Sequence, residues 1–161
     1  ASLHAARSGA EVTHVDASKK AINLAFKNRD NNNMKNSSIR FIIEDAVKFV
    51  QREIRRGVKY DGVILDPPKY GRGPNGEKWN IEKDLHHLLN LVEKLLSRDV
   101  LFVVLNCYAI RSSHTALYNA LSYALKNHKG ELSSGELVLE ESGNSLRKLS
   151  CAIFARWEKS N

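Results

Sequence analysis

An aspartate followed by two prolines ends an apolar run, and these residues are the clearest candidates for chemistry in the chain. Asp66, Pro67, Pro68 and Lys69 come directly after residues 60–65, which read YDGVIL. A short apolar run of this kind predicts a buried parallel strand, and two prolines cannot continue its hydrogen-bonded ladder. Asp66 is therefore predicted to lie at the carboxyl end of a parallel strand, where open α/β sheets bind their ligands.

The two prolines give this corner a particular chemistry. Pro67 and Pro68 have a fixed φ and no backbone N–H, so they form a rigid turn that offers carbonyl acceptors and no donors. Such a turn suits a planar base that carries an amino group. The alternative for Asp66 is a turn aspartate whose carboxylate binds its own backbone.

The elements that must position these residues alternate along the chain as α-β-α-β-α-β-α-β-α-β-β. Alternation predicts an α/β fold, a doubly wound, Rossmann-like and mostly parallel sheet, and two final strands without a helix between them predict a C-terminal antiparallel hairpin. Helical periodicity predicts that Leu24 faces inward on one helix and that another spans residues 81–97. The predicted strands are residues 11–16, 39–43, 60–65, 100–106, 136–140 and 149–157.

Composition narrows the class of protein further. The 161 residues are 42% hydrophobic, which allows one domain with a real core, and no apolar run is long enough to cross a membrane. The net charge of +7 favours a polyanionic partner such as RNA, although many basic proteins bind no nucleic acid. Two cysteines cannot form a disulfide framework, no Cys/His spacing predicts a metal site, and a reducing, cytoplasmic location fits best.

Residues 63–73, which read VILDPPKYGRG, resemble motif IV of class I S-adenosylmethionine-dependent methyltransferases. The resemblance is strongest to the branch related to bacterial large-subunit ribosomal RNA methyltransferases, and the order of elements extends it over almost the whole chain. It implies a methyltransferase that uses S-adenosyl-L-methionine and acts on a base in RNA, with ribosomal RNA as the expected substrate.

The resemblance begins late in that fold, because the first predicted strand corresponds to the second strand of such enzymes and no G-x-G turn precedes it. Residues 1–161 are therefore expected to be a partial catalytic domain whose first strand is missing. That strand would lie mid-sheet, so two strand edges would be unpaired. We expect a partner chain, or a further part of the parent protein, to cover them.

The resemblance also implies residues that hold the cofactor. Asp16, at the end of the first predicted strand, would accept hydrogen bonds from the ribose hydroxyls, and Asp45 would accept one from the adenine amine. The backbone N–H of Ala46 would reach a ring nitrogen, and Asp66 would contact both cofactor and target. For Asp16 and Asp45 the alternative is a helix N-cap, a role that Ser18 can fill for the helix after Asp16.

The region after the prolines is expected to bind the target nucleotide. Lys69 stands where amino-methylating relatives have an aromatic residue, so Tyr70 is the candidate for stacking on a flipped base. Lys69, Arg72 and Lys78 are candidates for phosphate contacts. Residues 67–80 are predicted to be a loop, and residues 71–79 within it read as a mobile, glycine-containing segment that could form a lid. Trp79 either stacks on a base or anchors the next helix.

Cys107 directly follows the fourth predicted strand, which corresponds to the fifth strand of class I methyltransferases, and cytosine-C5 RNA methyltransferases place a nucleophilic thiol at that strand end. The alternative is a small buried cysteine, and Cys151 is expected in the core of the last strand. No histidine is assigned a catalytic role. Three other functions stay open: methylation of a protein or small molecule, a non-catalytic binding or dimerisation module, and a nicotinamide-binding domain.

Overall fold

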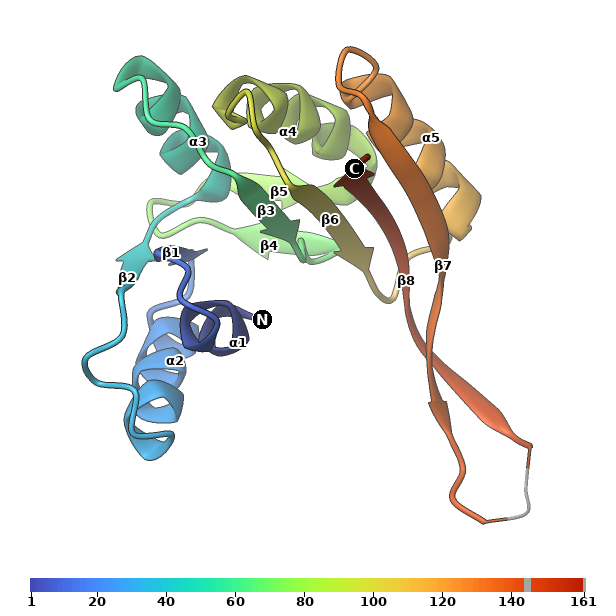
Figure 1. Ribbon diagram of the computed structural model, residues 1–161, viewed down its shortest axis with the longest axis horizontal. Coiled ribbons are helices and arrows are strands. Elements are labelled where there is room, and N and C mark those ends of the chain that lie inside the picture. The colour runs from blue at the N-terminus through green and yellow to red at the C-terminus, as the bar shows by residue number, and fades with distance from the viewer. Residues whose placement is uncertain (144–145, 161) are drawn as a thin grey trace. The chain divides into compact units, whose positions relative to one another are not determined.

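A computed structural model of the chain describes residues 1–143 and 146–160 (Figure 1). Backbone contacts divide it into two units. Unit 1 comprises Ala1–Arg52 and Arg72–Lys78, and unit 2 comprises Glu53–Gly71 and Trp79–Asn161. The helices and strands are α1 Ser2–Arg7, β1 Val12–Asp16, α2 Lys19–Asn31, β2 Ile39–Ile43, α3 Ala46–Arg55, β3 Gly62–Leu65, β4 Tyr70–Arg72, β5 Lys78–Asn80, α4 Ile81–Leu95, β6 Phe102–Cys107, α5 His114–Ala124, β7 Gly130–Glu140 and β8 Lys148–Lys159.

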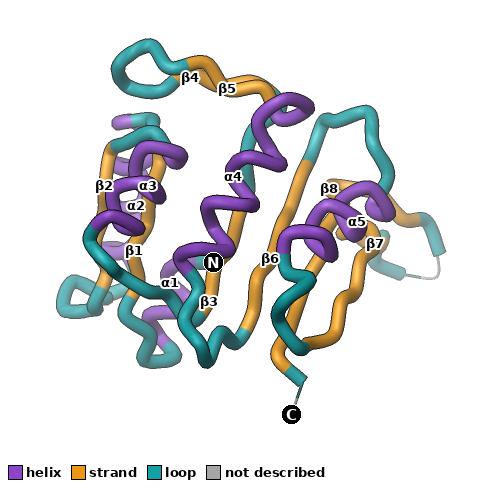
Figure 2. Tube along the Cα trace, turned by 90° about the horizontal axis from the view of Figure 1, so that it is seen from above, coloured by secondary structure: helices purple, strands orange, loops and turns teal. Residues whose placement is uncertain are grey.

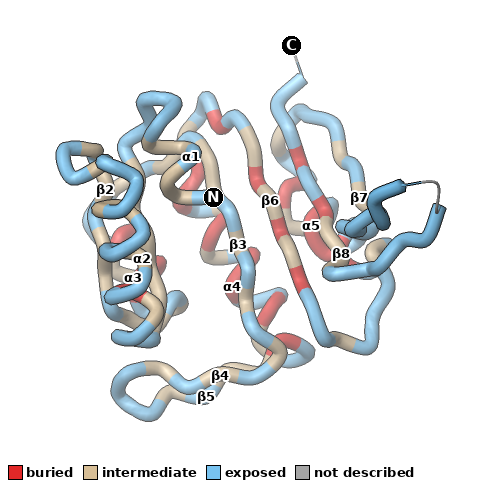
Figure 3. The backbone as a smooth tube through the Cα atoms, turned by 90° about the horizontal axis from the view of Figure 1, so that it is seen from below, coloured by how far each residue is buried: buried red, intermediate tan, exposed pale blue. Residues whose placement is uncertain are grey.

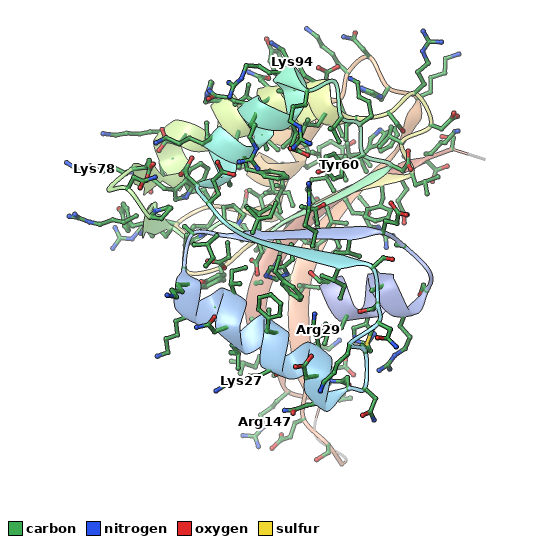
Figure 4. The ribbon with its side chains drawn as sticks, turned by 90° about the vertical axis from the view of Figure 1, so that its left-hand side faces the viewer. Lys27, Arg29, Tyr60, Lys78, Lys94 and Arg147 are labelled. Carbon is green, nitrogen blue, oxygen red and sulfur yellow. The ribbon has the colours of Figure 1, made fainter. Side chains whose placement is uncertain are left out.

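Unit 1 is built on the parallel pair β1–β2, which α1 and α2 contact. Ser18 caps α2 as predicted, since its hydroxyl accepts the N–H of Ala21. The prediction for Leu24 was wrong, because its side chain is 58% exposed while Ile22 is buried. The side of α2 that carries Arg29 (Figure 4) faces β2, because the guanidinium of Arg29 lies 5.8 Å from the ring centre of Phe41. Leu24 lies on another side of the helix and points outward.

Unit 2 is built on a four-stranded sheet in the order β3-β6-β8-β7. β3 and β6 are parallel, whereas β8 is antiparallel to both β6 and β7, so the predicted C-terminal hairpin is confirmed. α4 and α5 lie side by side on one face of this sheet (Figure 2). The predicted apolar stripe of α4 is buried there, and it consists of Ile81, Leu85, Leu88, Val92 and Leu95.

Burial alternates along β6 with the two-residue period of a strand. Its buried side chains are Val103, Leu105 and Cys107, whereas Phe102, Val104 and Asn106 are half-buried. Figure 3 shows the buried segments concentrated in β6, β8, α4 and α5. The residues of β6 therefore divide between the face that the helices cover and the opposite face.

Among the described strands, β1 pairs only with β2 and β3 pairs only with β6. Each of these two parallel strands therefore keeps one edge without a ladder partner, as the sequence led us to expect.

Two segments differ from their predictions. Residues 67–80, predicted as a loop, contain β4 and β5, which pair with each other as a small sheet. Cys151, predicted in the core, is exposed. The reason is that β8 pairs with β6 only from Ile153 to Glu158, so residues 148–152 have β7 alone beside them and extend past the sheet (Figure 1).

Glu53 is a fully buried carboxylate whose partners hold β3 in place. The hydroxyl of Tyr60 donates to Glu53 Oε2 at 3.0 Å, and the guanidinium of Arg56 lies 3.1 Å from Oε1. The backbone of Tyr60 also hydrogen-bonds to Leu95 and Ser97, at the end of α4. A buried charge is tolerated only when it is paired, so these contacts tie the start of β3 to α3 and α4.

We predict that Tyr60→Phe lowers the free energy of unfolding by about 1–3 kcal/mol, because it leaves the buried carboxylate with one donor fewer. Urea denaturation followed by circular dichroism measures this change. Tyr123→Phe is the matched control, since Tyr123 is 63% exposed, and it should leave the midpoint unchanged. Equal midpoints for the two variants would contradict the role given to Tyr60.

Candidate functional site

Asp66 lies one residue past the end of β3, where the two prolines stop the strand. The last parallel pair joins Leu65 to Leu105, so the next residues, Asp66 and Asn106, follow at the same level on neighbouring strands. Asn106 Nδ2 donates to Asp66 Oδ1 at 3.1 Å. An exposed carboxylate and a carboxamide thus meet at the carboxyl ends of β3 and β6. This edge of a parallel sheet is the usual place for a ligand.

The proline corner after Asp66 is fixed by a tryptophan. The indole N–H of Trp79 donates to the carbonyl oxygen of Pro68 at 2.7 Å. One of the two predicted proline acceptors therefore already has a donor, and Trp79 takes the anchoring role rather than the stacking one. The backbone of β4 lies close to the proline corner, because a Cβ on Gly71 would lie 3.3 Å from Pro68 Cγ.

The side chains predicted to contact the target nucleotide are mostly on the surface. Tyr70 is 62% exposed, and the ammonium of Lys69 lies 5.4 Å from its ring centre in a cation–π contact. Arg72 on β4 and Lys78 on β5 (Figure 4) are exposed as well. The structure thus presents one aromatic ring and several cations on the segment that follows the prolines.

The turn of the β4–β5 hairpin is ordered by hydrogen bonds within unit 1. The side chain of Glu77 pairs with Lys48 and accepts the N–H of Asn75, while its carbonyl accepts the N–H of Gly73. The hydrogen bond from Lys48, with help from the backbone, lowers the pKa of Glu77 to about 2. This segment is therefore a defined turn at neutral pH, and the lid role predicted for it stays a prediction.

Asp16 and Asp45 lie at the carboxyl edge of the β1–β2 pair. The register joins Asp16 to Ile43, and Asp45 follows two residues later. Asp16 Oδ1 accepts the N–H of Ser18 at 2.7 Å, and Asp45 Oδ1 accepts the N–H of Lys48 at 3.0 Å, which makes Asp45 the cap of α3. Within the described residues neither Oδ2 receives a hydrogen bond, so each carboxylate keeps one free acceptor. Ala46 is the exposed first residue of α3.

Cys107 follows Asn106 but lies on the opposite, covered face of β6. Its side chain is fully buried. Burial, and secondarily the negative charge of Asp66, raise the pKa of the Cys107 thiol to about 11. A nucleophilic cysteine needs the thiolate form at neutral pH. The environment of Cys107 therefore favours the alternative that it is a buried structural cysteine.

Sequence reasoning missed Asn106 as a candidate. The available signal was a polar residue at the end of the otherwise apolar run of residues 100–105. The contact with Asp66 depends on the pairing of two strands that are 40 residues apart, which a reading of single segments does not provide.

Residues 1–143 and 146–160 contain no group of three or more His, Cys, Asp or Glu side chains that could hold a metal ion. In the same residues no helix is long and apolar enough to cross a membrane.

Similar proteins with curated names are ribosomal RNA methyltransferases, although no protein-family model matches the chain. A Methanocaldococcus jannaschii protein, provisionally named as a ribosomal RNA large subunit methyltransferase, is 41% identical over 106 residues, which are 66% of this chain and 27% of that protein. Ribosomal RNA large subunit methyltransferase I of Pseudoalteromonas translucida is 36% identical over 70 residues, which are 43% of this chain and 18% of that protein. The chain thus spans about a quarter or less of these relatives.

Solved structures resemble the chain over nearly its whole length. A crystal structure of an S-adenosylmethionine-dependent methyltransferase from Agrobacterium tumefaciens is 44% identical, with a TM-score of 0.95, and the match covers 99% of this chain and 52% of that one. The fold is shared by magnesium protoporphyrin IX methyltransferase from Synechocystis PCC 6803 with bound S-adenosylmethionine. That protein is 15% identical, with a TM-score of 0.61, and the match covers 99% of this chain and 64% of that one. The chain therefore has the fold of class I S-adenosylmethionine-dependent methyltransferases, and its relatives in sequence lie in the ribosomal RNA large-subunit branch of that family.

Proposed function

We propose that this protein transfers a methyl group from S-adenosylmethionine to a base in ribosomal RNA. The observation that carries the proposal is the exposed carboxylate of Asp66, held by a double-proline turn at the carboxyl ends of β3 and β6. The 44% identity to the Agrobacterium methyltransferase, over 99% of this chain, supports the assignment. In this role Asp66, the carbonyl oxygen of Pro67 and the second lone pair of the Pro68 carbonyl, whose other acceptor position is taken by Trp79, accept hydrogen bonds from the reacting groups.

The acidic residues of unit 1 have the chemistry that the cofactor needs. A ribose offers two hydroxyl donors and adenine offers an amino group, whereas Asp16 and Asp45 each keep a free carboxylate oxygen. Asp16 would accept from the ribose and Asp45 from the amine, and the N–H of Ala46, at the start of α3, would donate to a ring nitrogen. When bound, S-adenosylmethionine supplies the activated methyl group.

The residues after the prolines suit a nucleic acid. Lys69, Arg72 and Lys78 would neutralise phosphates, and the exposed ring of Tyr70 would stack on an unpaired base. The net charge of +7 supports an anionic partner. Both cysteines are free thiols, in agreement with a cytoplasmic protein that acts on ribosomes.

The two unpaired strand edges support a second proposal about partners. β1 and β3 each have one hydrogen-bonded neighbour among the described strands. An unpaired strand edge exposes backbone N–H and C=O groups that a further strand can pair. We propose that strands outside this chain, from the rest of the protein or from a partner, pair with these edges, and that the chain without them binds cofactor less well.

Asp66→Ala should lower methyl transfer to ribosomal RNA by about a hundredfold or more, because a positioned acceptor is lost from the reacting centre. Transfer of tritiated methyl groups, measured in the protein encoded by the complete gene, tests this. Asp99→Ala is the matched control, since Asp99 is an exposed carboxylate that pairs with Lys159. If Asp66→Ala methylates at the wild-type rate, the site assignment is wrong.

Cofactor binding is tested separately by calorimetric titration of S-adenosylhomocysteine. Asp16→Ala and Asp45→Ala should each weaken binding by about tenfold or more, because each variant loses at least one hydrogen bond to a charged group. Asp30→Ala is the control from unit 1, where Asp30 pairs with Arg29. Unchanged affinity in both variants would contradict the cofactor roles of these residues.

Cys107 should resist alkylation by iodoacetamide at pH 8 while Cys151 is modified. With a thiol pKa of about 11, only about one Cys107 in a thousand is ionised at that pH, and the side chain is also buried. Peptide mass spectrometry of the native protein identifies the modified residue. Rapid labelling of Cys107, together with loss of methyl transfer in Cys107→Ser, would instead support a thiolate nucleophile.

A further inference from the structure

The carboxamide of Asn106 has one end paired and the other unpaired. Its Nδ2 donates to Asp66 Oδ1 at 3.1 Å, whereas its Oδ1 is buried and has no hydrogen-bond partner among the described residues. The orientation of the amide follows from this contact, because the reverse orientation would place an acceptor oxygen against a carboxylate oxygen.

An unpaired buried acceptor lowers stability, so the Oδ1 of Asn106 is a cost to the fold. An apolar residue of similar volume, such as leucine, would leave no polar atom unpaired at this position. What only the amide provides is the N–H that reaches Asp66. A polar group that destabilises the fold while it holds a candidate functional residue fits a functional role better than a structural one.

Backbone strain just after β6 also supports a functional role for this segment. Ala109, three residues after Asn106, has φ of 55°, a left-handed conformation that is unfavourable for a residue with a Cβ. The end of β6 and the residues after it therefore carry two destabilising features, the unpaired Oδ1 of Asn106 and the left-handed backbone of Ala109. Strain of this kind is typical of segments whose geometry is set by function.

The contact with Asn106 has a direct consequence for Asp66. One carboxylate oxygen is occupied, so rotation of the carboxylate is restricted, and Oδ2 receives no hydrogen bond from the described residues. A restricted acceptor loses less entropy when a ligand donor binds it, and small errors in its direction are costly in rate.

We propose that Asn106 is a positioning residue, which orients the Asp66 carboxylate so that Oδ2 accepts an N–H or O–H donor of the ligand. The inference rests on the proposed function of Asp66. It assigns Asn106 no contact with the ligand, so the effect of its removal must disappear when Asp66 is absent.

The test is a double-mutant cycle in the protein encoded by the complete gene, with Asn106→Leu, Asp66→Ala and the combined variant. Methyl transfer to ribosomal RNA and the thermal midpoint are measured for each. Asn106→Leu should keep or raise the midpoint and yet lower transfer by about tenfold, whereas in the Asp66→Ala background it should have no further effect. Asn119→Leu, at an exposed position on α5, is the matched control.

A second variant gives a signature that loss of structure would not produce. In Asn106→Asp two carboxylates face each other, and the hydrogen bond to Asp66 can form only when the pair holds a proton. The ratio of its transfer rate to that of the wild type should therefore rise as the pH is lowered from 8 to 5.5. A ratio that does not change with pH would count against the proposal.

The outcomes separate the inference from the proposed function. If Asp66→Ala loses activity but Asn106→Leu keeps it, or if Asn106→Leu is equally harmful in both backgrounds, the positioning role is overturned and the proposed function survives. If Asp66→Ala itself keeps wild-type activity, the role assigned to Asp66 is wrong and the inference fails with it. If the wild-type protein transfers no methyl group to ribosomal RNA, the proposed function itself fails. A lower thermal midpoint for Asn106→Leu, with a matching loss of folded protein, would also overturn it.

Discussion

The parallel pairing of β3 with β6 is the constraint on which the candidate site depends. Its register ends with Leu65 beside Leu105, and Pro67 and Pro68 prevent β3 from continuing. Asp66 and Asn106 meet because both follow this last pair. A shift of the register by one residue would move Asn106 to the covered face and bring Cys107 beside the carboxylate instead. The two faces of β6 thus separate the polar site from the packed core.

In unit 2, the buried carboxylate of Glu53 and the buried Oδ1 atom of the half-buried Asn106 differ in whether they have hydrogen-bond partners. The carboxylate of Glu53 is fully buried and receives hydrogen bonds from Tyr60 and Arg56, so it contributes to a packed junction of α3, β3 and α4. The carboxamide of Asn106 is paired at one end and unpaired at the other. A satisfied polar group stabilises the junction, whereas an unsatisfied one beside an exposed carboxylate is a cost that function can explain.

Local patterns in the sequence predicted most of the architecture. The apolar stripe of α4, the cap at Ser18 and the end of β3 at two prolines each depend on a few neighbouring residues, and all are found in the structure. The failures depend on distant partners. Leu24 is exposed because Arg29 turns the same helix toward Phe41, and Cys151 is exposed because β6 ends before reaching it. The strands β4 and β5 have three residues each, which is too short for an alternation of apolar and polar residues to be recognised.

The candidate site, like the fold, was predicted where its residues depend on local sequence and missed where they depend on distant partners. Asp66 was recognisable from the residues around it, and so were the edges at which Asp16 and Asp45 lie. Asn106 was not, since its role depends on a contact across two strands. For Cys107 the sequence left two alternatives, a nucleophilic thiol and a small buried cysteine. The choice depends on which face of β6 the helices cover, and periodicity alone does not identify that face.

Hydrogen–deuterium exchange with and without S-adenosylhomocysteine, in the protein encoded by the complete gene, tests most directly whether the carboxyl ends of these strands form the ligand site. We expect slower exchange in peptides that contain the residues after β1, β2 and β3, and no change at the distal end of the β7–β8 hairpin, where Arg147 pairs with Glu141 (Figure 4). Saturating binding that leaves exchange after all three strands unchanged would contradict the account.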